Sequence, residues 1–263
     1  MNRARRRPPL VVVVLALATV TLFALPLIGL IQRAGWSNIV RDLSTPVARD
    51  AFRLSLVCSL SAAALSAFLG TPLAWVLART EVPGRALIRG LVLLPLVLPP
   101  VVAGVALLAA FSRNGLVGRW LYDALGLQLT FSIWGAILAE TFVALPFYVI
   151  TVEAALASID RRFEDVAASL GARPRTVFRR VTVPMILPSL VAGLVLAWAR
   201  ALGEFGATIT FAGNIQGRTQ TLPLAVYLQL EGQPGAAIAM SLVLLAVSLL
   251  VLVSLRDRWL RPA

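Results

Sequence analysis

Residues 165–188 read DVAASLGARPRTVFRRVTVPMILP and carry four arginines in a chain that is 59% hydrophobic. Gly171 and Pro174, both helix breakers, divide the stretch before it runs into apolar residues. Ahead of Gly171, apolar side chains recur at the i, i+3, i+4 and i+7 positions of one helix face, namely Phe163, Val166, Ala167 and Leu170. Asp160 suits the N-cap of this helix, Gly171 its C′ position, and Pro174 the first turn of a second helix. The stretch therefore predicts a basic helix–turn–helix hairpin.

The composition is that of an integral membrane protein. Charged residues make up 14% of the chain, whereas soluble domains carry about a quarter, and the mean hydropathy is +0.87. Several uncharged runs are long enough to cross a bilayer, which takes roughly 20 residues. We therefore expect an all-α, polytopic membrane protein.

Missing residue types exclude several functions. The net charge is +12, and all 24 basic residues are arginines. Without lysine the chain has no Walker A phosphate loop and is no ATPase of that class. Without histidine, and with Cys58 as the single cysteine, it has neither an intramolecular disulfide nor a Cys/His zinc site. The arginines lie in short clusters between apolar runs, which indicates membrane topology and not nucleic-acid binding.

Six apolar runs predict six transmembrane helices, over 10–31, 54–78, 90–112, 131–152, 183–203 and 236–255. A signal peptide begins like this chain, but its apolar region is usually about 7–15 residues, so we expect the first run to be a retained span. An even number of spans places both termini on one side. If that side is the cytoplasm, it receives 16 arginines and the other side seven. The positive-inside rule thus predicts cytoplasmic termini and a cytoplasmic hairpin at the plasma membrane.

Two charged residues lie deep in the fifth apolar run. Arg200 and Glu204 are four residues apart and share a helical face. Charges at this depth mark functional sites, although a structural ion pair, or a pair between Arg200 and Glu140, explains them as well. Glycines on both sides of Glu204 and Phe205 predict a helix break, where transporters place gates and ligands.

The segment 205–235 is polar and rich in glycine, and we expect it on the external side. It can dip back into the protein if it lines a cavity or packs against helices. Its hydroxyl and amide side chains would suit a doubly charged anion, but a hydrated external loop accounts for them too. The candidate gate or pathway residues are Arg200, Glu204, Thr208, Thr210 and Asn214.

On its residues alone, the hairpin is either an interfacial loop held against anionic lipid or a docking site for a cytoplasmic partner. It resembles the EAA loop of ABC importer permeases, whose signature is EAA, three residues, Gly, nine residues, Ile, any residue and Leu-Pro. The matching positions here are Asp165-Val166-Ala167, Gly171, Val181 and Val183-Pro184, with the same spacing throughout. This chain departs from the signature by having Asp in place of Glu, and Val in place of Ala, Ile and Leu. Glu164, one residue earlier, can share the acidic role.

This resemblance implies the type I permease fold over 53–256, with 156–182 as the cytoplasmic coupling loop. Residues 1–52 would form an N-terminal tail, a first span and an external loop, and 257–263 a cytoplasmic tail. The resemblance implies that a separate ATPase subunit, which uses ATP and Mg²⁺, docks on the hairpin. The coupling residues would be Glu164, Asp165, Ala167, Gly171, Val181 and Pro184. A homodimer and an extracytoplasmic binding protein would complete the importer, and the chain itself would bind no cofactor and catalyse no reaction.

The stretch GEFGATITFAGNIQGRTQTLPLAVYLQLE, residues 203–231, is similar to permeases for tetrahedral oxyanions, the molybdate and sulfate/thiosulfate group. It resembles the molybdate permeases most, so molybdate is the expected substrate, with sulfate, thiosulfate and tungstate as alternatives. A secondary transporter driven by an ion gradient is a rival, but such proteins usually show internal repeats. A membrane scaffold or enzyme is a second rival.

Overall fold

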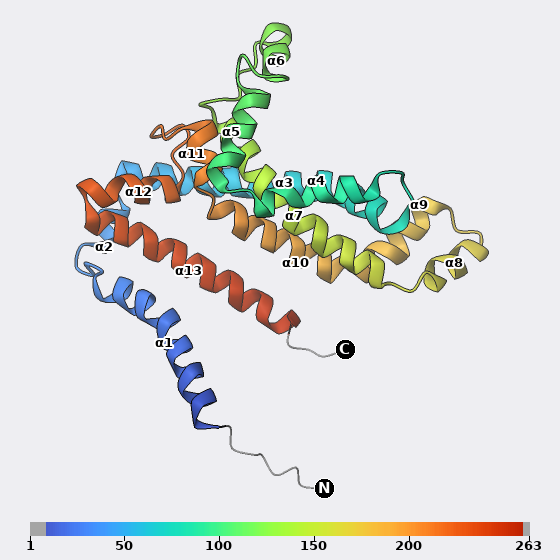
Figure 1. The fold of residues 1–263 in the computed structure, drawn as a ribbon, viewed down its shortest axis with the longest axis horizontal. Coiled ribbons are helices and arrows are strands. Elements are labelled where there is room, and N and C mark those ends of the chain that lie inside the picture. Colours follow the sequence, from blue (N-terminus) through green and yellow to red (C-terminus); the bar gives the residue numbers. More distant parts are fainter. Residues whose placement is uncertain (1–8, 260–263) are drawn as a thin grey trace.

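The computed structural model describes residues 9–259, and the side chains of residues 9–253. Residues 1–8 of the predicted N-terminal segment 1–52, and residues 260–263 of the predicted tail 257–263, lie outside this range. Within it, every regular element is helical (Figure 1). The helices are α1 (Leu10–Gln32), α2 (Ile39–Leu43), α3 (Pro46–Arg79), α4 (Arg85–Val97), α5 (Pro100–Phe111), α6 (Gly118–Leu125), α7 (Ile133–Ser158), α8 (Arg162–Ser169), α9 (Pro174–Val177), a π-helical turn η1 (Phe178–Thr182), α10 (Val183–Leu202), α11 (Gly206–Ala212), α12 (Leu222–Gly232) and α13 (Pro234–Trp259).

Among the described residues, five helices are long and apolar enough to cross a membrane: α1, α3, α7, the continuous helix 174–202 and α13. The third predicted span, 90–112, is not one helix. Leu98 takes an extended conformation with ψ 133°, and the chain divides there into α4 of 13 residues and α5 of 12. Pro99 and Pro100 have no N–H to donate to the preceding turn, and a residue before proline avoids the helical region. Each half is too short to cross a bilayer alone.

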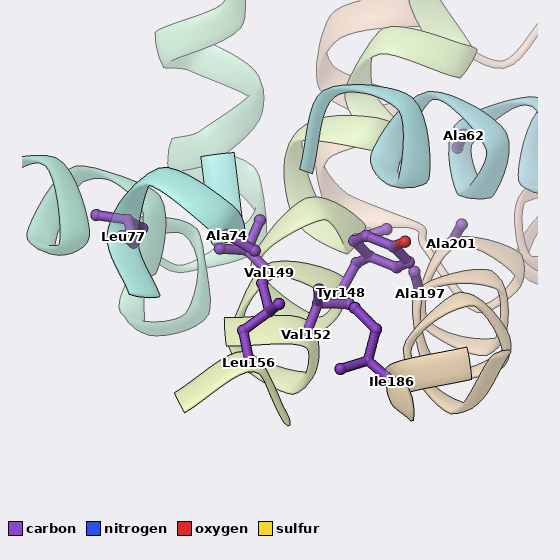
Figure 2. Packing of buried hydrophobic residues seen from close by; sticks show 11 residues of the cluster. Ala62, Ala74, Leu77, Tyr148, Val149, Val152, Leu156, Ile186, Ala197 and Ala201 are labelled. Carbon is purple, nitrogen blue, oxygen red and sulfur yellow. The ribbon is translucent and has the colours of Figure 1, made fainter. Parts of the chain in front are cut away.

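The core is a bundle of α3, α7 and α10, which lie side by side (Figure 1). Apolar side chains from these three helices interlock around Tyr148, whose ring lies between α3 and α10 (Figure 2). Gly70 and Gly193 pack directly against this ring, and the Tyr148 hydroxyl is 2.8 Å from Thr71 Oγ1. Small residues let transmembrane helices approach closely, so that dispersion contacts stabilise the bundle.

The remaining helices extend this core at two ends. α8 and α9 lie at one end, and α2 and α12 lie at the other (Figure 1). α11 packs on α5 and α7, so the segment 205–235 does dip back against other helices. α5 and α6 turn away from the line of the long helices, and α1 has no buried residue.

Candidate functional site

The hairpin forms as its sequence predicts, with one shift at its start. α8 begins at Arg162, one residue later than an N-cap at Asp160 requires, but Asp160 Oδ1 still accepts a hydrogen bond of 3.0 Å from the Arg162 N–H. At the other end the Ala172 N–H reaches Ala167 O and the Gly171 N–H reaches Ala168 O, the two bonds of a Schellman motif. Gly171 has φ 83°, a value that favours glycine.

The outward face of α8 is apolar. Phe163, Val166 and Leu170 are 58%, 60% and 83% exposed, and they follow the predicted i, i+3, i+7 spacing. Asp165 is exposed on the side of α8 that faces α3, and its carboxylate makes no ion pair within the described part of the chain. An exposed apolar stripe at the end of a bundle has the chemistry of a docking face.

Glu164 is partly buried and faces the bundle. Its Oε1 accepts a hydrogen bond from Thr182 Oγ1 at 2.7 Å and lies 3.3 Å from Arg79 Nη2. The structure therefore divides the predicted coupling residues. Asp165 and Gly171 lie at the exposed hairpin, whereas Glu164 bonds within the chain. Val181, in η1, and Pro184, at the start of α10, follow the hairpin as the motif spacing requires.

A groove of about 900 Å³ separates the hairpin from α3. Its lining includes the aromatic side chains of Trp75 and Phe178 and the guanidinium groups of Arg175 and Arg179.

The predicted pair of Arg200 and Glu204 is present. Arg200 Nη1 lies 2.6 Å from Glu204 Oε2, and Glu204 Oε1 accepts a hydrogen bond of 2.8 Å from the Ala207 N–H. The helix breaks as expected, because α10 ends at Leu202 and α11 begins at Gly206. Glu204 thus joins the last turn of α10 to the first turn of α11.

The alternative partner, Glu140, is 1% exposed, and its Oε2 has no hydrogen-bond partner among the described residues. Since Arg200 pairs with Glu204, the structure decides between the two pairings that the sequence left open.

The other candidate pathway residues differ in how they are bound. Thr210 Oγ1 donates to Gly206 O at 2.8 Å, and Asn214 Nδ2 donates to Leu224 O at 3.4 Å. Thr208 is fully buried, and its hydroxyl has no partner within the described range. Thr210 and Asn214 therefore donate their hydrogen bonds to carbonyl groups of this chain. Among these three residues, Thr208 alone has a hydroxyl without a partner in the described range.

Sequence reasoning did not find Arg79 and Thr182 as partners of Glu164. Arg79 lies 85 residues away along the chain, so no local spacing connects the two. Thr182 faces Glu164 because of the π-helical turn η1, and no residue in FRRVT has a strong preference for such a turn.

Residues 70–262 match the family described as binding-protein-dependent transport system inner membrane component. The chain is 48% identical over 245 residues to the molybdenum transport system permease protein ModB of Mycobacterium tuberculosis, with 92% of each chain covered. It is 36% identical over 250 residues to the sulfate transport system permease protein CysT of Escherichia coli, which covers 92% of this chain and 90% of that one.

Among solved structures, the fold matches a chain in the crystal structure of a bacterial alginate ABC transporter in complex with an alginate pentasaccharide-bound periplasmic protein. The TM-score is 0.74 at 21% identity, and the match covers 92% of this chain and 91% of that chain. The family match spans the hairpin, the helix break at Glu204, α7, α10 and the last ten residues of α3. This chain belongs to the family of binding-protein-dependent transport system inner membrane components.

Proposed function

We propose that this chain is the permease subunit of an ATP-driven importer for a tetrahedral oxyanion, and that the oxyanion is molybdate. The observation that carries the proposal is the exposed face of α8. Phe163, Val166 and Leu170 are more than half exposed at the end of the bundle, at the spacing of a loop that contacts an ATPase subunit in the permeases it resembles.

An ATPase subunit would cover this face. Phe163 and Val166 on α8 and Leu170 at its C-cap are large, apolar and exposed. An exposed apolar patch of this kind marks a surface that a partner covers. The rigid Schellman turn at Gly171 would let the partner push on α8 without unwinding it. ATP and Mg²⁺ would be bound by that partner, and this chain would bind no cofactor.

The membrane arrangement that supports transport is a homodimer with a pathway between two copies. α4 and α5 together would make the sixth crossing, with the break at Leu98 near its middle. α5 and α6 leave the bundle (Figure 1) and expose Val101, Val105 and Trp120, which a second copy would cover. The arginine distribution favours cytoplasmic termini in the plasma membrane.

The charges near the helix break fit a pathway that releases its anion. Arg200 is 28% exposed, but Glu204 neutralises it, so the pair offers no lasting positive site that would trap a dianion. Selectivity would then lie with the extracytoplasmic binding protein that delivers the oxyanion. The 48% identity to a ModB protein, against 36% to a CysT protein, favours molybdate over sulfate.

The test is uptake in vesicles that contain this chain with its cognate ATPase and binding protein. We expect ATP-dependent molybdate uptake that excess sulfate does not suppress. Leu170→Asp should lower ATPase co-purification and uptake together, whereas Leu170→Met keeps the apolar face and should preserve both. Stronger competition by sulfate than by molybdate would assign the sulfate alternative. Uptake that needs an ion gradient and no ATP would contradict the proposal.

A further inference from the structure

The Glu164 carboxylate joins three elements at one oxygen. Thr182 Oγ1, at the end of η1, donates to Oε1 at 2.7 Å, and Arg79 Nη2, at the end of α3, lies 3.3 Å from the same atom. Glu164 itself lies in the first turn of α8. One side chain therefore connects the hairpin to the ends of two helices of the bundle.

This junction is largely shielded from water. The side chain of Arg79 is 7% exposed and that of Glu164 is 22% exposed, and Thr182 is 2% exposed. Arg79 Nε has no hydrogen-bond partner among the described residues, so Glu164 is the group that compensates the buried guanidinium. Hydrogen bonds to charged groups are stronger than neutral ones, and more so away from water.

The π-helical turn determines that Thr182 faces Glu164. The Val183 N–H bonds to Phe178 O, five residues earlier, which inserts one residue relative to an α-helical turn. One extra residue shifts the phase of the following helix by about 100°. Thr182 and Ile186, both 2% exposed, therefore face inward while Val177 and Phe178 remain along the groove. Single π turns inside α-helices frequently occur at functional sites.

We infer that Glu164 is a positioning residue that acts inside this chain, by transmitting displacement of α8 to α3 and to the continuous helix 174–202. This inference rests on the proposed function, since it presumes that an ATPase subunit pushes on α8. It divides two neighbouring acidic residues by their bonds: both line the groove beside α3, but Glu164 bonds to the spans, whereas Asp165 is exposed and makes no ion pair among the described residues. Without the junction, the hairpin could move into the groove beside α3 without moving the bundle.

The experiment separates docking from transmission in the full transporter with ATPase and binding protein. Glu164→Gln keeps an acceptor for Thr182 but removes the charge that faces Arg79, and Thr182→Val removes the hydroxyl at nearly constant volume. We expect both variants to co-purify with the ATPase as the unaltered chain does. The amount of molybdate imported per ATP hydrolysed should fall by about tenfold, which corresponds to about 1.4 kcal/mol.

Glu153→Gln is the matched control. Glu153 pairs with Arg85 and Arg89 and joins α4 to α7 at the same end of the bundle, so neither of these ion pairs involves α8. It should lower the unfolding temperature as Glu164→Gln does and leave the import-to-hydrolysis ratio unchanged.

Two results would overturn the inference while leaving the proposed function in place. One is loss of ATPase co-purification in Glu164→Gln, as expected for Leu170→Asp, because Glu164 would then lie in the docking interface. The other is an equal fall in the ratio for Glu153→Gln, because the effect would then be general destabilisation. If Leu170→Asp also leaves co-purification and uptake unchanged, the hairpin is not the docking site, and the proposed function fails with the inference.

Discussion

Removing the charge of Arg200 should be more damaging than removing that of Glu204, although the two residues form one ion pair. Glu204 is 1% exposed and Arg200 is 28% exposed, with 2.6 Å between Nη1 and Oε2. Arg200→Gln leaves a buried carboxylate whose remaining described contact is the Ala207 N–H at 2.8 Å. Glu204→Gln keeps an oxygen for that N–H and leaves a guanidinium that water can partly reach.

The expected costs follow from these exposures. Breaking a fully buried pair by removing one partner costs about 3–5 kcal/mol, and the partial exposure of Arg200 lowers this to about 2–3 kcal/mol for Arg200→Gln. Glu204→Gln should cost about 1 kcal/mol, the net contribution of one hydrogen bond. The double variant should recover about 1–2 kcal/mol of the summed loss, because residues in contact are not additive.

Thermal unfolding of the purified protein and uptake in vesicles would measure the effect. Arg119→Gln is the control, because Arg119 and Asp123 have the same i, i+4 spacing but are 78% and 65% exposed, and such pairs contribute about 0.2–1 kcal/mol. Uptake should be measured with molybdate and sulfate in competition. An unpaired carboxylate 4 Å from a dianion would repel it by about 8 kcal/mol at an effective dielectric of 20, so Glu204 should not contact the substrate.

A greater loss for Glu204→Gln than for Arg200→Gln would refute this ordering. A change of preferred anion in Glu204→Gln, with turnover preserved, would place Glu204 in the substrate site and refute the reasoning entirely.

Three further predictions concern topology, the hairpin and the core. In a Cys58→Ser background, a cysteine introduced at exposed Ser158 should react with an impermeant thiol reagent only from the cytoplasm, and one at Gln216 only from outside; labelling of position 158 in intact cells would exclude this topology. Gly171→Trp should abolish ATPase co-purification, because φ is 83° and the ring adds bulk at the hairpin. Gly171→Asn is the control, because asparagine tolerates this conformation, and it should retain ATPase co-purification. Normal uptake by the Trp variant would contradict a docking role. Glu140→Gln should keep or raise the unfolding temperature, because the carboxylate has an unsatisfied buried oxygen and burying a charge without a partner is costly. A fall of several degrees would contradict this and would show that the Glu140 charge has a stabilising partner.

Features set by local spacing were predictable from the sequence. The Gly171 turn follows from a Schellman geometry that needs a left-handed residue, and the Arg200–Glu204 pair follows from helical periodicity. Both depend on residues no more than five positions apart, so backbone geometry alone brings the atoms together.

Features set by packing were not predictable. The break at Leu98 lies in an apolar run whose length suits a span, and its prolines are tolerated in membrane helices when neighbours satisfy the backbone. α11 forms in a glycine-rich segment because Ala207 and Phe211 are buried against α5 and α7, and only the folded bundle supplies that surface. The contact between Glu164 and Arg79 depends on the register of two distant helices.

The seam between α5 and α11 restricts how this sequence can diverge. A Cβ added at Gly206 would lie 2.5 Å from Pro100 Cβ, and one added at Gly104 would lie 2.5 Å from Thr210 Cβ. A larger residue at either glycine cannot be accommodated by a rotamer change, because the opposing atoms sit on or next to the backbone. Random substitution at these two positions would therefore be removed by selection unless the facing helix shifted in the same lineage. Residues 100 and 206, like 104 and 210, should change together among descendants or not at all, even though none of the four needs to touch a substrate.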